Sequence, residues 1–297
     1  MTIQILEFAE GHMPAVVKLL NEEYSDSFEF IPYSEERVRS EMRRRRLKIL
    51  VAEENGNPQG LIGTHLEERG EENVAWLATK HGPGRRVIEN KLLNEAEKNA
   101  RSDTITTAVD EGSPKISEWI SRGYTLSPGW LRMSTRLDGL KKISKVDGSF
   151  KLRSLRIGEE EKLVKAMNVG FGWKRLECGV LEEWKSMDPP FSEDWVQVAE
   201  INEKIVSAVV ARPDTEYLKH LNLKRGYLGP ATTLPEFRNK GVASALTIQA
   251  MNLLYTKEMD SVRLGASELN ISSFNLLTGL GFHVDLVRKI LRKKLNI

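Results

Sequence analysis

The chain has 297 residues, of which 40% are hydrophobic and 29% charged, and its formal net charge is +2. This length is sufficient for two hydrophobic cores, and the composition is typical of a globular protein. The balanced charge argues against a nucleic-acid partner, because such proteins usually carry a basic stripe and a recognisable reading module. The densest basic run, residues 43–46, ends a predicted helix, and both a solvated helix end and an anionic partner are compatible with it.

Cysteine and histidine usage bears on the compartment and on metals. Cys178 is the single cysteine, so no disulfide can form within the chain, which suits a reducing compartment. The histidines show no metal-ligand spacing. Residues 1–6 lead straight into a strand pattern without a signal peptide, and no apolar run reaches the length of a membrane span. We therefore expect a cytoplasmic protein that binds neither metal nor membrane.

The first half of the sequence predicts strands interleaved with helices. Ser34 is suited to cap a helix, because Glu35 and Glu36 follow in its first turn, and Asn55-Gly56 is a strong hairpin signal. In chain order we predict a strand at 3–8, helices at 12–21 and 34–46, strands at 47–53, 60–67 and 74–79, a helix at 86–100, a strand at 104–109, a helix at 114–121 and a strand at 130–137.

The second half repeats this order. A Gly-aromatic pair follows a predicted helix in both halves, at residues 123–124 and 281–282. We predict a first domain at 1–138, a polar linker at 139–149 and a second domain at 150–297, with one continuous mixed domain as the alternative. The predicted elements are strands at 150–155, 195–201, 205–211, 227–234, 261–266 and 287–295 and helices at 159–167, 242–255 and 272–280.

The segment 238–243, Arg-Asn-Lys-Gly-Val-Ala, lies between a predicted strand and an amphipathic helix. Gly241 allows a close approach of backbone to ligand, and Ala243 keeps the first helical turn small. The helix start presents free N–H groups to an anion, and Arg238 and Lys240 add cationic donors. The pattern therefore predicts a phosphate-binding loop, although a short pattern of this kind can also be a plain helix start.

A second pattern lies downstream, where Asn270 can cap a helix and Gly281 can end it in the left-handed conformation before Phe282 packs back. With these two patterns the sequence resembles the GCN5-related N-acetyltransferase family. The resemblance covers residues 150–297 well and 1–137 loosely. The tandem layout, with a degenerate first copy, is similar to that of mycothiol synthase and other double-domain members.

The resemblance implies an α/β fold (α+β mixed) of two tandem acyl-CoA N-acyltransferase domains. Each would have a mixed, mostly antiparallel sheet with splayed parallel central strands flanked by helices. In the second copy the splayed strands would be 227–234 and 261–266, with the pantetheine arm of coenzyme A between them. The implied contacts are Thr232, Thr233 and Leu234 along the arm, Arg238, Asn239, Lys240, Gly241, Val242, Ala243 and Ser244 at the pyrophosphate, and Asn270 and Phe274 on the far side of the arm.

The implied activity is direct transfer of an acetyl group from acetyl-CoA, the co-substrate, to a primary amine of a small molecule or peptide. In many family members a tyrosine seven residues after the helix-leading Asn protonates the leaving thiolate, and Leu277 stands at that position here. A non-catalytic acyl-CoA sensor and a ligand-free structural pair of domains are therefore the alternatives. No catalytic residue is assigned, since the polar residues expected near the acceptor are equally compatible with a surface role: Glu200, Glu203, Glu216, Tyr217 and His220.

Three further points stay open at this stage. The first copy keeps Gly82 and Gly84 but has Thr79 where the second copy has Arg238, so it is either a structural partner or a second coenzyme A site. The chain is compatible with a monomer or a homodimer. The aromatic residues between the first helix and the first hairpin of the second copy either pack in the core or form a wall for the acceptor: Phe171, Trp173, Trp184, Phe191 and Trp195.

Overall fold

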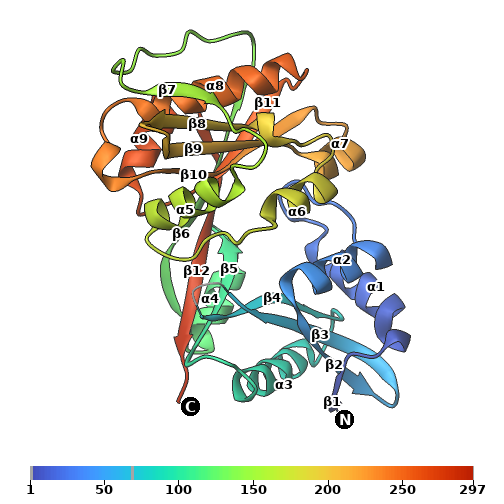
Figure 1. Ribbon diagram of the computed structural model, residues 1–297. Coiled ribbons are helices and arrows are strands. Elements are labelled where there is room, and N and C mark those ends of the chain that lie inside the picture. Colours follow the sequence, from blue (N-terminus) through green and yellow to red (C-terminus); the bar gives the residue numbers. More distant parts are fainter. Residues whose placement is uncertain (1–2, 68–69, 297) are drawn as a thin grey trace. The chain divides into compact units, whose positions relative to one another are not determined.

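The computed structural model describes residues 3–67 and 70–296, and it divides into two compact units (Figure 1). Unit 1 comprises Met1–Gly129 and Arg288–Ile297, and unit 2 comprises Trp130–Val287. In each unit helices flank a mixed, mostly antiparallel sheet, so the predicted fold class is confirmed. None of the helices in the described ranges combines the length and apolar composition that crossing a bilayer requires.

The sheet of unit 1 has the strand order β1-β2-β3-β4-β5-β12, in which β4 and β5 are parallel and the other neighbours antiparallel. Its elements are β1 (Ile3–Glu7), the 3-10 turn η1 (Glu10–His12), α1 (Met13–Tyr24), α2 (Glu35–Arg45), β2 (Lys48–Glu54), β3 (Asn57–Leu66), β4 (Glu72–Thr79), α3 (Arg85–Lys98), β5 (Thr104–Asp110), α4 (Lys115–Ser121), the first residues of β6 (Thr125–Arg136) and the last residues of β12 (His283–Lys294).

Both faces of the unit 1 sheet are covered. Leu61 packs with α1 and α2 on one face, whereas its neighbour Ile62 packs with α3 on the other, because successive strand residues point to opposite faces. The hairpin between β2 and β3 turns at Asn55 and Gly56, which have φ angles of 51° and 74°. Both residues tolerate this left-handed conformation, so the hairpin prediction is confirmed.

The sheet of unit 2 has the strand order β6-β11-β10-β9-β8-β7, with β10 and β11 as the parallel pair. Its further elements are β7 (Lys151–Ser154), α5 (Glu160–Phe171), α6 (Val180–Met187), η2 (Glu193–Trp195), β8 (Val196–Ile201), β9 (Lys204–Pro213), α7 (Thr215–Leu221), β10 (Arg225–Thr233), η3 (Pro235–Phe237), α8 (Val242–Thr256), β11 (Ser261–Ser267) and α9 (Ile271–Gly279).

The core of unit 2 places the long helix α8 directly against the central strands. Gly226 of β10 faces Leu254 of α8, and a Cβ atom at position 226 would come within 2.5 Å of that leucine. Of the five aromatic residues left open above, Trp184, Phe191 and Trp195 are buried in this core, so the core-packing alternative is confirmed for these three.

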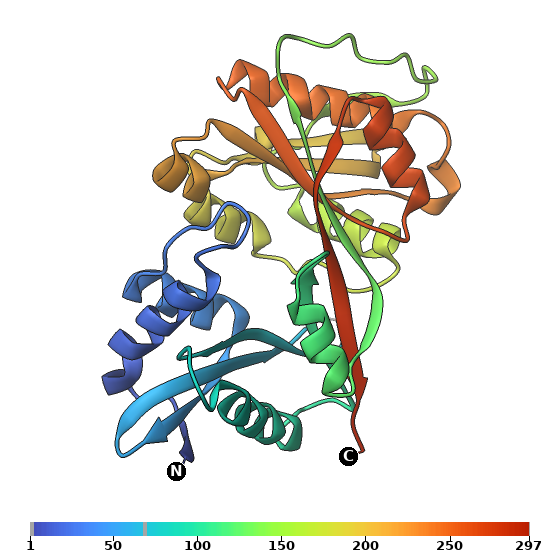
Figure 2. The same ribbon diagram turned by 180° about the vertical axis from the view of Figure 1, so that it is seen from behind.

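Two strands cross between the units. Residues 130–136 of β6 pair with β11 in unit 2, and residues 288–294 of β12 pair with β5 in unit 1. Figure 2 shows the last strand, β12, running beside β5. The predicted ranges 1–138 and 150–297 assign these two segments the other way round. A strand pattern records which face is buried and does not identify the neighbour that supplies the hydrogen bonds.

Candidate functional site

In unit 2 the parallel strands β10 and β11 separate part of the way along their length. Their pairing runs from Arg225 opposite Ser261 to Leu228 opposite Leu264 and then stops. Beyond that point β10 continues beside β9 after a bulge that ends at Ala231, while β11 continues beside β6. The edge of β10 that faces away from β9 therefore runs on without a strand partner among the described residues. We call this point of divergence the fork.

The loop that follows β10 ends at Gly241, which has a φ angle of 76° and is the N-cap of the 15-residue helix α8. Asn239, two residues earlier, also has positive φ, at 60°. Within the described part of the chain, no hydrogen bond uses the main-chain amides from Asn239 to Ser244 as donors. These amides lie at the positive end of the helix dipole, which makes them a ready anion site.

Arg238 anchors this loop through two hydrogen bonds. Its Nε donates to the carbonyl oxygen of Thr233 at 3.1 Å, and its Nη2 donates to the carbonyl oxygen of Gly170 at 2.9 Å. The side chain therefore ties the end of β10 to the last turn of α5. We expected Arg238 to supply a cationic donor to phosphates, whereas in this structure two of its donors are used by the protein.

The residues predicted along the arm differ in what they offer. The Thr233 hydroxyl lies 2.8 Å from that of Ser207, and the amide of Leu234 donates to the carbonyl of Val206 at 2.9 Å. Thr232 packs against α5, because a Cβ atom at Gly170 would lie 2.2 Å from its hydroxyl oxygen. A ligand arm in the fork would therefore meet the backbone edge of β10 rather than these side chains.

The residues predicted for the far wall of the fork lie at the start of α9. Asn270 caps that helix, with its side-chain oxygen accepting from the Ser273 amide at 3.0 Å. Phe274 is partly buried against the core. Leu277 is 7% exposed and belongs to the core, so this position presents no proton donor to the fork.

The polar residues considered near the acceptor do not converge on one point. Glu200 accepts from Arg153 at 2.9 Å, and the hydrogen bonds from Arg153 hold the pKa of Glu200 below its ordinary value, which disfavours it as a base. Glu203 lies exposed in the β8–β9 turn. Glu216 and His220 are exposed on α7, a helix that the sequence did not predict.

A row of polar side chains that sequence reasoning missed crosses the sheet of unit 2. Tyr227 of β10 stands opposite Arg212 of β9 and Arg263 of β11, so the three share one face. Arg212 also pairs with Asp188 at 3.0 Å, and burial raises the pKa of this aspartate above its ordinary value. The guanidinium carbon of Arg263 lies over the ring of Tyr217 of α7, 4.1 Å from the ring centroid. The period-two spacing of the strands was the only signal that could have found this row.

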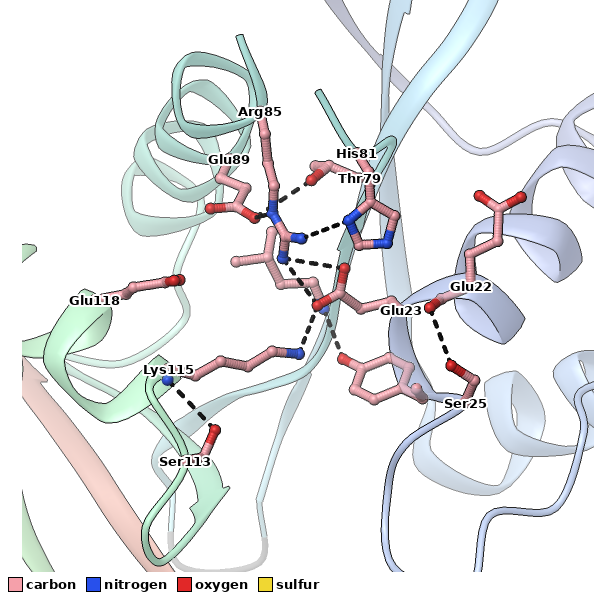
Figure 3. A network of polar contacts seen from close by, with 12 residues as sticks. Glu22, Glu23, Ser25, Thr79, His81, Arg85, Glu89, Ser113, Lys115 and Glu118 are labelled. Atoms are coloured by element: carbon pink, nitrogen blue, oxygen red, sulfur yellow. Dashed lines mark hydrogen bonds and ion pairs between the residues drawn. The ribbon is translucent and has the colours of Figure 1, made fainter. Parts of the chain in front are cut away.

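Unit 1 has a corresponding divergence between β4 and β5, which pair from Glu72 opposite Ile105 only as far as Val74 opposite Thr107. Figure 3 shows the residues beyond this point. Here Glu23 of α1 contacts the first residues of the two helices that follow the diverging strands. Its carboxylate, 2% exposed, lies 3.0 Å from Arg85 of α3 and 2.5 Å from Lys115 of α4. A buried ion-pair network thus links the two helix starts.

The same network occupies several side-chain donors at this place and one backbone amide. Arg85 also bonds Glu89 at 2.7 Å, and Glu89 accepts from Thr79 at 3.3 Å (Figure 3). The hydroxyl of Tyr24 accepts from the amide of Leu77 at 3.1 Å, so an amide of β4 beyond the paired residues is already satisfied. Burial raises the pKa of Tyr24 and keeps this hydroxyl neutral. Unit 1 thus places its own side chains beyond the point where β4 and β5 diverge.

Comparison with known proteins identifies the class of fold. Residues 151–273 match the protein family described as acetyltransferase (GNAT) domain, whereas no curated protein matches the sequence. A GCN5-related N-acetyltransferase from Sphaerobacter thermophilus superposes with a TM-score of 0.71 at 14% identity, over 98% of this chain and 95% of that chain. A tandem GNAT protein from the clavulanic acid biosynthesis pathway superposes with a TM-score of 0.71 at 14% identity, over 100% and 99%.

A third similar structure is a glucosamine N-acetyltransferase region of a fungal multi-domain GH3 beta-N-acetylglucosaminidase, with a TM-score of 0.77 at 12% identity, over 98% of this chain and 38% of that chain. Residues 151–273 therefore match the GNAT acetyltransferase domain family, and the whole chain has the fold of a tandem GNAT protein. Among the described residues no cluster of three or more His, Cys, Asp or Glu side chains is arranged to hold a metal ion.

Proposed function

We propose that the protein transfers an acetyl group from acetyl-CoA directly to a primary amine of a small molecule or peptide, using a site in unit 2. The observation that carries this proposal is the run of open amides from Asn239 to Ser244 at the start of α8, directly beyond the fork. A diphosphate is the part of coenzyme A that such a helix start binds best. No metal is required, because the amides and the helix dipole supply the positive potential.

In this proposal the pantetheine arm enters the fork and runs along the free edge of β10, past Thr232, Thr233 and Leu234. Asn270 and Phe274 form the opposite wall. The amine nitrogen attacks the thioester carbonyl, a C–N bond forms and the C–S bond breaks, and the amine loses a proton to solvent or a base. Main-chain amides near the bulge of β10 would stabilise the negative charge that develops on the carbonyl oxygen.

Two considerations support a small amine as the acceptor. One similar fold is described as a glucosamine N-acetyltransferase region, whose acceptor is an amino sugar. In addition, Glu200 and Glu203, which lie on or beside the β8–β9 hairpin, form no acidic groove that would select a basic peptide, since Glu200 is paired with Arg153. A cytoplasmic location, the absence of nucleic-acid or membrane partners, and a monomeric or homodimeric state remain predictions.

The second candidate is a non-catalytic acyl-CoA sensor, and the buried Leu277 favours it. Titration calorimetry of the full chain with acetyl-CoA tests both candidates against a ligand-free structural role. Absence of binding heat at millimolar acetyl-CoA would support the structural role. We expect one coenzyme A per chain, because Glu23 and its partners fill the equivalent place in unit 1. Release of free thiol with a panel of amino sugars, amino acids and polyamines then distinguishes enzyme from sensor. A sensor binds acetyl-CoA but releases no thiol above the rate without amine.

A further inference from the structure

The aromatic ring of Tyr227 is fixed between two arginines. Its neighbours across the sheet, Arg212 and Arg263, have their guanidinium carbons 5.4 Å and 5.9 Å from the ring centroid. Arg212 is itself stacked against Trp184 at 5.4 Å and paired with Asp188. Cation–π contacts of this kind favour one orientation of the ring. The direction in which Tyr227 points is therefore defined by buried and half-buried neighbours.

The hydroxyl of Tyr227 lies at the fork. A Cβ atom built at Gly229 would be 3.6 Å from this oxygen, and one built at Gly265 would be 3.9 Å from it. Gly229 belongs to the bulge of β10, and Gly265 is the first residue of β11 beyond the last paired position, Leu264. The oxygen thus sits beside the diverging strands on both sides of the opening.

This hydroxyl is open to a ligand. It takes part in none of the hydrogen bonds formed among the described residues, and Tyr227 is only partly buried. Gly265 is exposed, and a Cβ atom there would meet no atom within 4 Å other than this hydroxyl. Between Tyr227 and Gly265 the fork therefore holds open space with a hydrogen-bond donor on its wall.

We propose that Tyr227 is a catalytic residue that donates its phenolic proton to the departing sulfur of coenzyme A. The inference rests on the proposed function and adds the group that replaces Leu277. A strand rises roughly 3.3 Å per residue, so the bulge lies about 13 Å from Thr233 at the cofactor loop. An extended pantetheine arm spans a distance of this order, which brings its sulfur to the fork.

The proton balance of the step is complete without another reagent. As the C–S bond breaks, the sulfur takes the electron pair and the proton of Tyr227, and coenzyme A leaves as a thiol. The tyrosinate recovers a proton from water, into which the amine has released one. Protonation of a leaving group by a positioned side chain contributes about 10²–10⁴ in rate.

The kinetic test compares Tyr227→Phe with the control Tyr217→Phe. Both keep the ring, and both tyrosines stack on Arg263, but only Tyr227 reaches the fork. We expect kcat to fall about 100-fold in Tyr227→Phe, with the Kd for acetyl-CoA within two-fold of the unaltered protein and little change in Tyr217→Phe. A Tyr227→Phe protein with unaltered kcat overturns the proposal.

A second experiment needs no turnover and separates this inference from the proposed function. Tyr227→Cys and, as the control, Tyr217→Cys are made in a Cys178→Ser background and treated with coenzyme A disulfide. A sulfur held at the fork gives a mixed disulfide with the cysteine at position 227 much faster than with that at 217, detected as the added mass of one coenzyme A. Equal rates in a protein that binds coenzyme A by calorimetry overturn the role of Tyr227. Absence of coenzyme A binding by the unaltered chain instead contradicts the proposed function.

Discussion

Arg238 and Gly170 are joined by a hydrogen bond of 2.9 Å, although 68 positions separate them in the sequence. Gly170 lies in the last turn of α5, where carbonyl groups lack partners within the helix and a cation is favoured. Because Arg238 also holds the carbonyl of Thr233, the loop before α8 is braced from two sides. Arg238 therefore acts by fixing the position of the loop that carries the open amides from Asn239 to Ser244.

This bracing predicts that Arg238→Ala affects stability and binding together. Two hydrogen bonds from a charged donor are lost, so we expect the free energy of unfolding to fall by about 2 kcal/mol. The affinity for acetyl-CoA should fall with it, because the loop loses its fixed position. Urea denaturation and calorimetry on the same preparation check both effects. Weaker binding at unaltered stability would show instead that Arg238 contacts the phosphates directly.

Gly241→Ala should weaken coenzyme A binding at least ten-fold with a small loss of stability. The residue has φ of 76° and no neighbouring atom within 4 Å of a built Cβ, so the conformation alone disfavours alanine, by about 1 kcal/mol. The added methyl group also stands among the amides that would hold the diphosphate. Gly148→Ala, in the polar segment between the copies, is the control, since it also has open space and lacks positive φ. Equal affinities of the two variants for coenzyme A would contradict the assignment of the diphosphate site to the amides from Asn239 to Ser244.

Glu23→Gln should destabilise the protein without altering its coenzyme A stoichiometry. Loss of one partner from a buried ion pair costs roughly 3–5 kcal/mol, and the partial exposure of Arg85 and Lys115 lowers our expectation to about 2 kcal/mol. Its neighbour Glu22, 40% exposed, provides the control Glu22→Gln, expected within 0.5 kcal/mol of the unaltered protein. Thermal unfolding measures both. If calorimetry finds two coenzyme A molecules on the unaltered chain, the network around Glu23 does not prevent coenzyme A from binding to unit 1.

The pair formed by Glu200 and Arg153 predicts a specific acid dependence. The folded-state pKa of Glu200 is below its ordinary value because Arg153 donates to it, so the pair stabilises the fold above the unfolded pKa of about 4.3. This contribution is lost as the pH falls through the lower, folded value. The stability difference between Glu200→Gln and the unaltered protein should therefore shrink from pH 6 towards pH 3, measured by urea denaturation. Glu203→Gln, in the exposed turn, is the matched control.

Much of the fold could be predicted because its long elements have clear periodicity. The helix α8 and the hairpin of β2 and β3 follow from the apolar spacing and from Asn55-Gly56. The short helices α6 and α7 were not predicted, because seven or eight residues give too few turns for the helical period to be recognised. Residues 130–136 and 288–294 were placed as strands, but their partners depend on tertiary contacts that a local pattern does not encode.

In the candidate site, too, the features set by consecutive residues could be predicted and those set by tertiary contacts could not. The loop around Gly241 and the cap at Asn270 could be found because their chemistry lies within a few consecutive residues. Tyr227 could not be assigned a role, since it does not stand at the position of the family's tyrosine and its role depends on neighbours in β9 and β11 and on where the parallel pairing stops. The side chain of Arg238 illustrates the limit of motif reasoning. Its position was foreseen, whereas its bonding partners come from α5 and the end of β10.

The crossing of β12 has a consequence for how the protein is made. Leu291 is fully buried and joins Ile105, Trp119 and Tyr124 in the core of unit 1, yet it is synthesised only after the whole of unit 2. Until then the edge of β5 stays open, a state in which strands associate wrongly. A premature stop codon at Arg288 would therefore do its damage in unit 1, most of which is synthesised before unit 2.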